Sequence, residues 1–165
     1  SLVGSEMCIR DRMDTYAVKG LQPGQIQFLY APTHLNPTYE YGVTFERGTA
    51  VTYGDRKQIF ISGTASIDNK GEIVYPGDIL KQTERMLENI DVLLQEAGAG
   101  LQDIMQAIVY LRDSADYVVV KQYIESRYPS FPHLIVHAPV CRPGWLIETE
   151  CIAVVPADEP QYACL

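Results

Sequence analysis

The hydrophobic and polar positions of this chain follow two periods, and each change of period marks a predicted element. Between residues 78 and 97, apolar side chains recur every three or four positions, as on the buried stripe of an amphipathic helix. Asp78 is suited to cap its start and Gly98 to follow its end. A similar spacing predicts a second helix at 116–128, which Pro129 ends.

Apolar, β-prone runs predict strands at 43–53, 58–62, 104–111, 133–138 and 145–155, with a short additional strand at 72–75. The sequence GDRK at 54–57 is typical of a hairpin turn between the first two. This order predicts an α+β fold, a mixed sheet backed by two helices on one face. The other face has no helix to cover it, so it must meet solvent or another subunit.

The chain divides into four parts of unequal character. Residues 1–12, SLVGSEMCIRDR, resemble a translated sequencing-adapter fragment, and we treat them as an artefact that makes Cys8 uninformative. Residues 13–42 are rich in Gly, Pro, Tyr and Asn without a sustained period, which predicts a linker or loop-rich arm. Residues 43–156 form the predicted domain, and 157–165 a C-terminal tail. The authentic gene is expected to begin upstream of residue 13.

Composition narrows the function classes. The net charge of -8, without a cluster of Lys and Arg, argues against nucleic acid as a partner. No apolar run approaches the roughly 20 residues that a membrane-spanning helix needs. The cysteines and histidines lack the spacing of a zinc site, so no metal and no other cofactor is expected. Reduced thiols in a cytoplasmic protein are the simplest interpretation.

The richest chemistry lies at 141–150, sequence CRPGWLIETE. It places a thiol, Cys141, a guanidinium, Arg142, and a carboxylate, Glu148, within eight residues. Glu148 and Glu150 are two apart in a predicted strand, so both point to one face. Carboxylates are rarely buried without a partner, so that face is either wet or part of a site.

Five segments, in order, resemble the Rid superfamily, also called the YjgF or L-PSP family. They are IFISG at 59–63, the helix with its Gln-Thr and Ala-Gly ends at 82–98, IVYLRD at 108–113, FP at 131–132 and IETECIA at 147–153. The resemblance implies a chorismate-mutase-like fold that assembles as a trimer with ligand sites between subunits. Imine deaminases of the family bind the substrate carboxylate with an arginine just after the FPA motif, where this chain has Leu134.

Two further segments resemble the C-terminal domain of chorismatases, which release pyruvate from chorismate. They are TFERG at 44–48 and CRPGWLIE at 141–148. This resemblance implies Glu148 as general acid and Cys141 as a catalytic thiol. It also implies Arg142 and Arg47 as clamps for the carboxylates of a small metabolite, and a missing N-terminal sister domain that would complete a pseudo-trimer. The small polar strand end Ser62, Gly63 and Thr64 would add to the substrate site.

Three functions therefore remain open. We favour a chorismatase-like hydrolase that acts by general-acid catalysis. The first alternative is an enamine or imine deaminase of the RidA type, in which Arg142 or Arg47 replaces the usual arginine. The second is a non-catalytic module that binds a small carboxylated metabolite.

Overall fold

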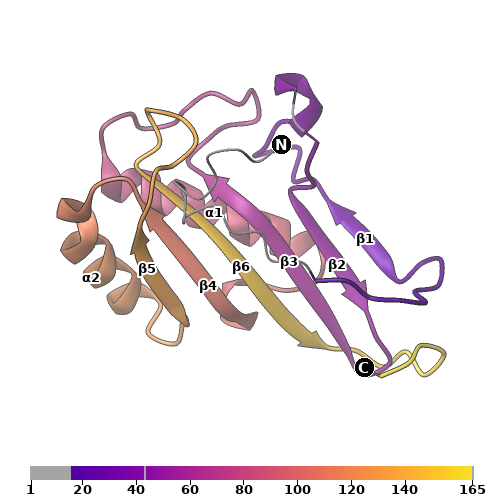
Figure 1. Cartoon of the computed structure of the whole chain (residues 1–165). Coiled ribbons are helices and arrows are strands. Elements are labelled where there is room, and N and C mark those ends of the chain that lie inside the picture. The colour runs from indigo at the N-terminus through magenta and orange to yellow at the C-terminus, as the bar shows by residue number, and fades with distance from the viewer. Residues whose placement is uncertain (1–15, 43, 165) are drawn as a thin grey trace, which may run out of the picture.

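The computed structural model describes residues 16–42 and 44–164, so the predicted artefact at 1–12 lies outside the described residues. Figure 1 shows one six-stranded sheet in the order β1-β2-β3-β6-β4-β5. Its strands are β1 (Ile26–Leu29), β2 (Gly48–Thr52), β3 (Arg56–Ala65), β4 (Ile104–Leu111), β5 (His133–His137) and β6 (Ile147–Pro156). Only β4 and β5 pair in parallel, so the sheet is mixed, as predicted.

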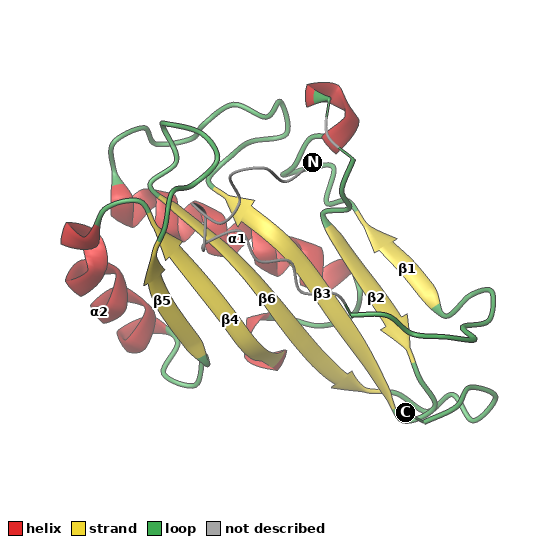
Figure 2. Cartoon of the chain, in the orientation of Figure 1, coloured by secondary structure: helices red, strands yellow, loops and turns green. Residues whose placement is uncertain are grey.

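The two helices, α1 (Ile79–Glu96) and α2 (Tyr117–Arg127), cover the same face of the sheet (Figures 1 and 2). The predicted α+β fold is therefore confirmed. The carboxylate of Asp78 accepts the Lys81 N–H at 3.0 Å, and Gly98 has the φ of +77° that suits a helix end. Short 3-10 helices, η2 (Thr38–Tyr41), η3 (Leu101–Asp103) and η4 (Ser114–Asp116), occupy connections.

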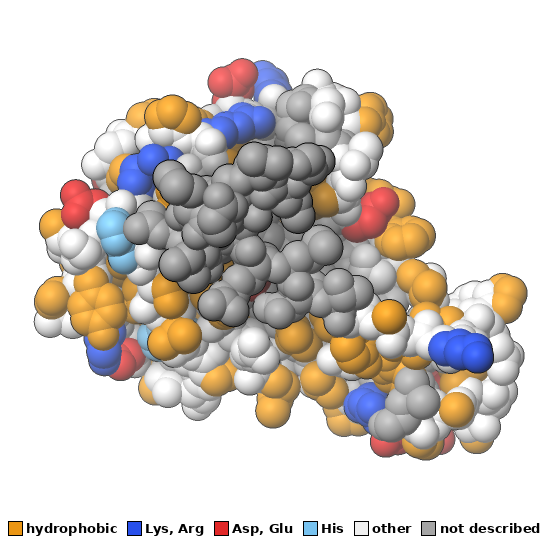
Figure 3. All heavy atoms as spheres, viewed as in Figure 1, with side chains coloured by type: hydrophobic (Ala, Val, Ile, Leu, Met, Phe, Trp, Pro, Cys, Tyr) orange, Lys and Arg blue, Asp and Glu red, His pale blue; other side chains and the backbone are white. Residues whose placement is uncertain are grey.

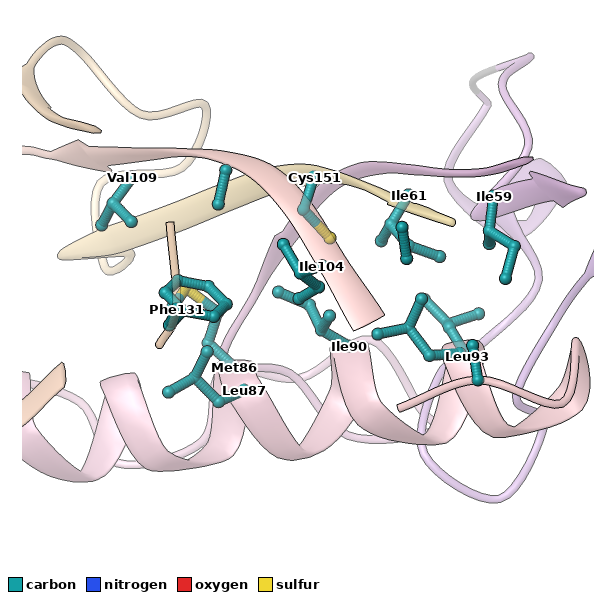
Figure 4. Close-up of a cluster of buried hydrophobic side chains, with 14 of the residues drawn as sticks. Ile59, Ile61, Met86, Leu87, Ile90, Leu93, Ile104, Val109, Phe131 and Cys151 are labelled. Atoms are coloured by element: carbon teal, nitrogen blue, oxygen red, sulfur yellow. The ribbon is translucent and has the colours of Figure 1, made fainter. Parts of the chain in front are cut away.

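The hydrophobic core lies between the sheet and α1. Figure 4 shows the apolar stripe of α1 meeting side chains that point down from the strands. The helix contributes Met86, Leu87, Ile90 and Leu93 to this core, and the sheet contributes Ile59, Ile61, Val109 and Cys151. The predicted stripe is thus the core face, and Cys151 is a small buried core residue. From α2 only Val120 and Ile124 are fully buried, so its stripe is narrower than predicted.

Three details of the strand prediction were wrong. The segment 72–75 forms no strand and contributes only the isolated bridge between Ile67 and Ile73, because Gly71 and Pro76 bracket a run too short to pair. The strand predicted from residue 43 starts at Gly48. Within the arm 13–42, Ile26–Leu29 pair antiparallel with β2 and extend the sheet. Three of these four residues are exposed, so the segment lacks the alternation of buried and exposed positions that would predict a strand.

The residues after β6 fold back on the turn between β2 and β3. The backbone N–H of Gly54 donates to the carbonyl of Ala163 at 3.2 Å, and the N–H of Glu159 donates to the carbonyl of Gly54 at 3.0 Å. A side chain at Gly54 would meet the Tyr162 carbonyl oxygen at 2.5 Å, which suits glycine. None of the helices in the described residues has both the length and the apolarity to cross a membrane.

Candidate active site at the end of the sheet

Two cavities meet at Glu148. The first, about 480 Å³, is lined by Phe45, Arg47, Ser62, Gly63, Ala65, Ile67, Cys141, Arg142, Trp145 and Glu148. The second, about 670 Å³, is lined by Gly63, Tyr110, His137, Ala138, Pro139, Val140, Cys141, Glu148 and Glu150. Gly63, Cys141 and Glu148 belong to both walls. A ligand in either cavity would therefore lie beside the same carboxyl group.

Alternation along β6 places Glu148 on the face away from the helices. Its neighbours Ile147 and Thr149 are fully buried, whereas Glu148 and Glu150 are partly exposed on the other face. The prediction that the two carboxylates share this face is confirmed. Burial raises the pKa of Glu148 above its ordinary value, and the negative charge of Glu150 raises it further. Glu148 is thereby suited to hold a proton nearer neutral pH.

A β-bulge at Ser62 and Gly63 makes room for this carboxyl. The pairing of β3 with β6 shifts register between Ile61 and Thr64. A Cβ atom at Gly63 would lie 2.1 Å from Oε1 of Glu148, so the glycine allows the close approach. The Ser62 hydroxyl donates to the Glu46 carbonyl at 2.6 Å. Thr64 lines neither cavity; it is buried, and its hydroxyl donates to the Ser62 carbonyl at 2.9 Å, which braces the bulge.

The segment 138–146, which carries Cys141 and Arg142, is held by two side chains beneath it. The Arg112 guanidinium donates to the carbonyls of Trp145 at 2.6 Å, Val140 at 2.7 Å and Arg142 at 2.5 Å. The side chain of Gln82, fully buried on α1, donates to the Gly144 carbonyl and accepts the Leu146 N–H, both at 3.0 Å. This segment is thus fixed against the sheet and helix.

The two predicted arginines line the first cavity from opposite segments. Arg47 is buried, its guanidinium donates to the Asn36 carbonyl at 2.9 Å, and it lies over the Phe45 ring at 5.4 Å. Arg142 donates to the Gly71 carbonyl at 3.0 Å and lies 5.1 Å from the Trp145 ring centroid. Cys141 is exposed on the shared wall. The structure therefore places Arg47, Arg142, Cys141 and Glu148 around one cavity.

The sequence analysis named neither Tyr110 nor Glu150 among the candidate site residues. The Tyr110 hydroxyl donates to Oε1 of Glu150 at 2.8 Å, and both residues line the second cavity. His137, on the same wall, places Nε2 3.1 Å from the Arg112 carbonyl. The pairing of β4 with β6, which aligns Tyr110 with Glu148, could not be read from the chain order. Within the described residues, no group of three or more side chains could hold a metal ion.

The family model described as Endoribonuclease L-PSP matches residues 48–155, which contain both helices, the strands β2 to β5 and all of β6 except Pro156. The chain belongs to the Endoribonuclease L-PSP family. The Rid resemblance read from the sequence is therefore confirmed at the level of the superfamily, while closeness to chorismatases is not shown.

Relatives within the L-PSP family bear different names. A RutC family protein of Pyrococcus abyssi is 40% identical over 98 residues, which cover 58% of this chain and 76% of the relative. The 3-aminoacrylate deaminase RutC of Acinetobacter baylyi is 31% identical over 99 residues, covering 59% and 79%. The crystal structure of the Escherichia coli YjgF gene product superposes with a TM-score of 0.62 at 22% identity, covering 78% and 98%. At this low identity, the superposition on the YjgF gene product shows a shared fold and nothing more.

Leu134 marks the departure from the deaminase motif of the L-PSP family. It lies on β5, is 61% exposed, and lines neither of the two cavities beside Glu148. An aliphatic side chain offers no hydrogen bond to a carboxylate. Among the residues that line the first cavity, Arg47 and Arg142 are the two cations that could bind an anion beside Glu148.

Proposed function

We propose that this protein is a deaminase of a small enamine or imine that carries a carboxylate. The observation that carries the proposal is the cavity that a partly buried, protonatable Glu148 lines together with two guanidinium groups. The 31% identity to a 3-aminoacrylate deaminase supports the choice of reaction. The sequence-based preference for a chorismatase-like hydrolase takes second place, because no relative reported above bears that name.

The chemistry begins at an electron-rich double bond. In 3-aminoacrylate, Glu148 donates its proton to the carbon next to the carboxylate, and the nitrogen lone pair becomes the C=N bond of an iminium ion. Water adds to the iminium carbon and loses a proton to the ionised Glu148. The carbinolamine then expels ammonia and leaves a carbonyl compound. For 3-aminoacrylate the balance is one water consumed, with 3-oxopropanoate and ammonia released.

Arg47 and Arg142 would bind the carboxylate of the substrate. A substrate carboxylate bound by guanidinium groups gains charge-assisted hydrogen bonds, and the reacting carbon is then fixed beside Glu148. Because the protein has a net charge of -8, an anionic substrate needs such local positive charge. The same balance of charge is why we do not propose RNA as the substrate, despite the name of the family.

The test measures ammonia release from 3-aminoacrylate generated in the assay. Glu148→Gln keeps the shape of the side chain but removes the acid, and turnover should fall roughly 10²–10⁴-fold. Glu125→Gln on α2 is the matched control, since it makes the same chemical change at an exposed ion pair with Lys121 and should keep activity. Absence of ammonia release by the wild type would reject the deaminase proposal.

A chorismatase-like reaction is the second candidate, favoured by Cys141 on the wall beside Glu148. It shares the first step, because an enol ether is also protonated at carbon, after which water adds and pyruvate leaves. Pyruvate release from chorismate, assayed with the same variants, separates the two. Binding of a carboxylated metabolite without either product would identify a non-catalytic binding module.

We also propose that other copies of the chain, or a sister domain, cover the free face of the sheet in a trimer or pseudo-trimer. Figure 3 looks onto this face and shows hydrophobic side chains exposed across its lower half. Phe60, Ile108 and Ile152 line a further cavity on the sheet, and the centroid of the Tyr16 ring lies 5.3 Å from that of the Phe60 ring. Such an apolar face is typical of an association surface. Light scattering that shows a stable monomer would reject the assembly.

A further inference from the structure

The second cavity contains a carboxylate that neither candidate reaction uses. Glu150 lies two residues beyond Glu148 on β6, on the same face. Across the sheet, Tyr110 is aligned with Glu148, while its hydroxyl reaches diagonally to Oε1 of Glu150 at 2.8 Å. Diagonal neighbours of this kind are within reach of an aromatic side chain. The two carboxyl groups and the phenol therefore form one cluster on the wall of the site.

We infer that Glu150, held in place by Tyr110, is a positioning residue that keeps Glu148 in its protonated, acid form. The inference rests on the proposed function for its catalytic meaning, because both candidate reactions need Glu148 to donate a proton. Two carboxylates that share a face resist being ionised together. The hydrogen bond from Tyr110 holds the Glu150 carboxylate near Glu148, where its negative charge opposes the ionisation of Glu148.

The Tyr110 hydroxyl can donate a hydrogen bond to Glu150 over a wide range of pH. Burial raises the pKa of its phenol well above the ordinary value, and the hydrogen bond to Glu150 raises it further. The phenol thus keeps its proton throughout the neutral range. Its hydrogen bond holds the Glu150 carboxylate in place beside the site.

Several other titratable or charged groups face Glu148 from the elements around it, and they set the background against which Glu150 acts. They are Tyr110 on β4, His137 on β5, Cys141 and Arg142 in the segment 138–146, and Arg47 before β2. The bulge of β3 contributes only uncharged residues. The guanidinium groups of Arg47 and Arg142 oppose Glu150, yet each donates to a backbone carbonyl. Burial and the charge of Glu150 raise the pKa of Glu148 in this setting.

The test is a pH titration of the Glu148 side-chain carboxyl by carbon-13 NMR, with the resonance assigned by its loss in Glu148→Gln. In Glu150→Gln the midpoint for Glu148 should move to lower pH, because the repelling charge is gone while the amide can still accept from Tyr110. Glu150→Ala should shift it in the same direction and serves if the Gln variant folds poorly. Glu125→Gln, which removes an equal charge on the helix side, should leave the midpoint unchanged.

Tyr110→Phe tests the second half of the inference. Without the phenol, Glu150 is free to turn into solvent, where its charge is screened, so the midpoint of Glu148 should fall by less than in Glu150→Gln. No fall would overturn the role of Tyr110, and an unchanged midpoint in Glu150→Gln would overturn the inference as a whole.

Because the titration uses no substrate, its result is independent of the proposed reaction. A shift without ammonia release would reject the deaminase and keep the cluster; ammonia release without a shift would do the reverse. In an active protein, Glu150→Gln should preserve the rate at low pH, and the rate should decline at a lower pH than in the wild type. A purely structural loss would lower the rate equally at every pH.

Discussion

Replacing Gly63 with alanine should displace the Glu148 carboxyl without disturbing the backbone. Gly63 does not have a positive φ, so alanine suits its conformation. The new Cβ would lie 2.1 Å from Oε1 and 3.1 Å from Cδ of Glu148. Ordinary contact starts at 3.4 Å, so the oxygen has to move by about 1.3 Å. Since the obstacle is the end of a flexible side chain, the fold tolerates the change while the acid leaves its position.

A displacement of about 1 Å in a reacting group typically costs roughly 10²-fold in rate. We therefore expect kcat/KM of Gly63→Ala to fall about 10²-fold, equivalent to about 2.7 kcal/mol of transition-state stabilisation. The assay is ammonia release, with thermal unfolding measured in parallel. Gly100→Ala is the matched control, because its Cβ would meet the flexible end of Gln102 at 2.6 Å, away from the site.

A double-mutant cycle tests whether Gly63 acts through Glu148. If Gly63→Ala acts only by moving the acid, it should have little effect in a Glu148→Gln background. Equal losses in both backgrounds would show that Gly63 acts through something other than Glu148. Unchanged kcat/KM in the single variant would show that the position of the carboxyl does not limit the reaction.

Three further outcomes follow from the same contacts. Arg112→Met should destabilise the fold by about 2–4 kcal/mol in urea denaturation, because three backbone carbonyls lose a charged donor. The pKa of Glu148 is raised from 4.5, so its contribution to stability is present below about pH 4.5 and is lost as the pH rises through the folded value. Glu148→Gln should therefore lose less stability than the wild type as the pH rises above about 4.5, as thermal unfolding at a series of pH values would show. Cys141→Ser should change deamination less than threefold but abolish pyruvate release if a chorismatase reaction uses the thiol, as product assays on the one variant would show.

The sequence by itself determined the layers of the fold and the direction of the key side chains. The helical stripe of α1 fixed which of its residues face the sheet, since a period of 3.6 leaves one buried side. The two-residue alternation of β6 fixed that Glu148 and Glu150 share the outer face. Both are local properties, which neighbouring residues decide. The motifs that resemble the Rid superfamily are also short runs of neighbouring residues, so they too could be recognised from the sequence.

Only the tertiary structure decided which distant segments meet. It added β1, whose exposed residues show no alternation and which is held by pairing with β2. The fold brings Arg47 and Cys141, which are far apart in the chain, to the wall of one cavity. It buries Thr64 outside that cavity, although the sequence predicted a binding role for this residue. It also joined Tyr110 to Glu150, because strand order and register, set by long-range pairing, determine which side chains lie opposite each other.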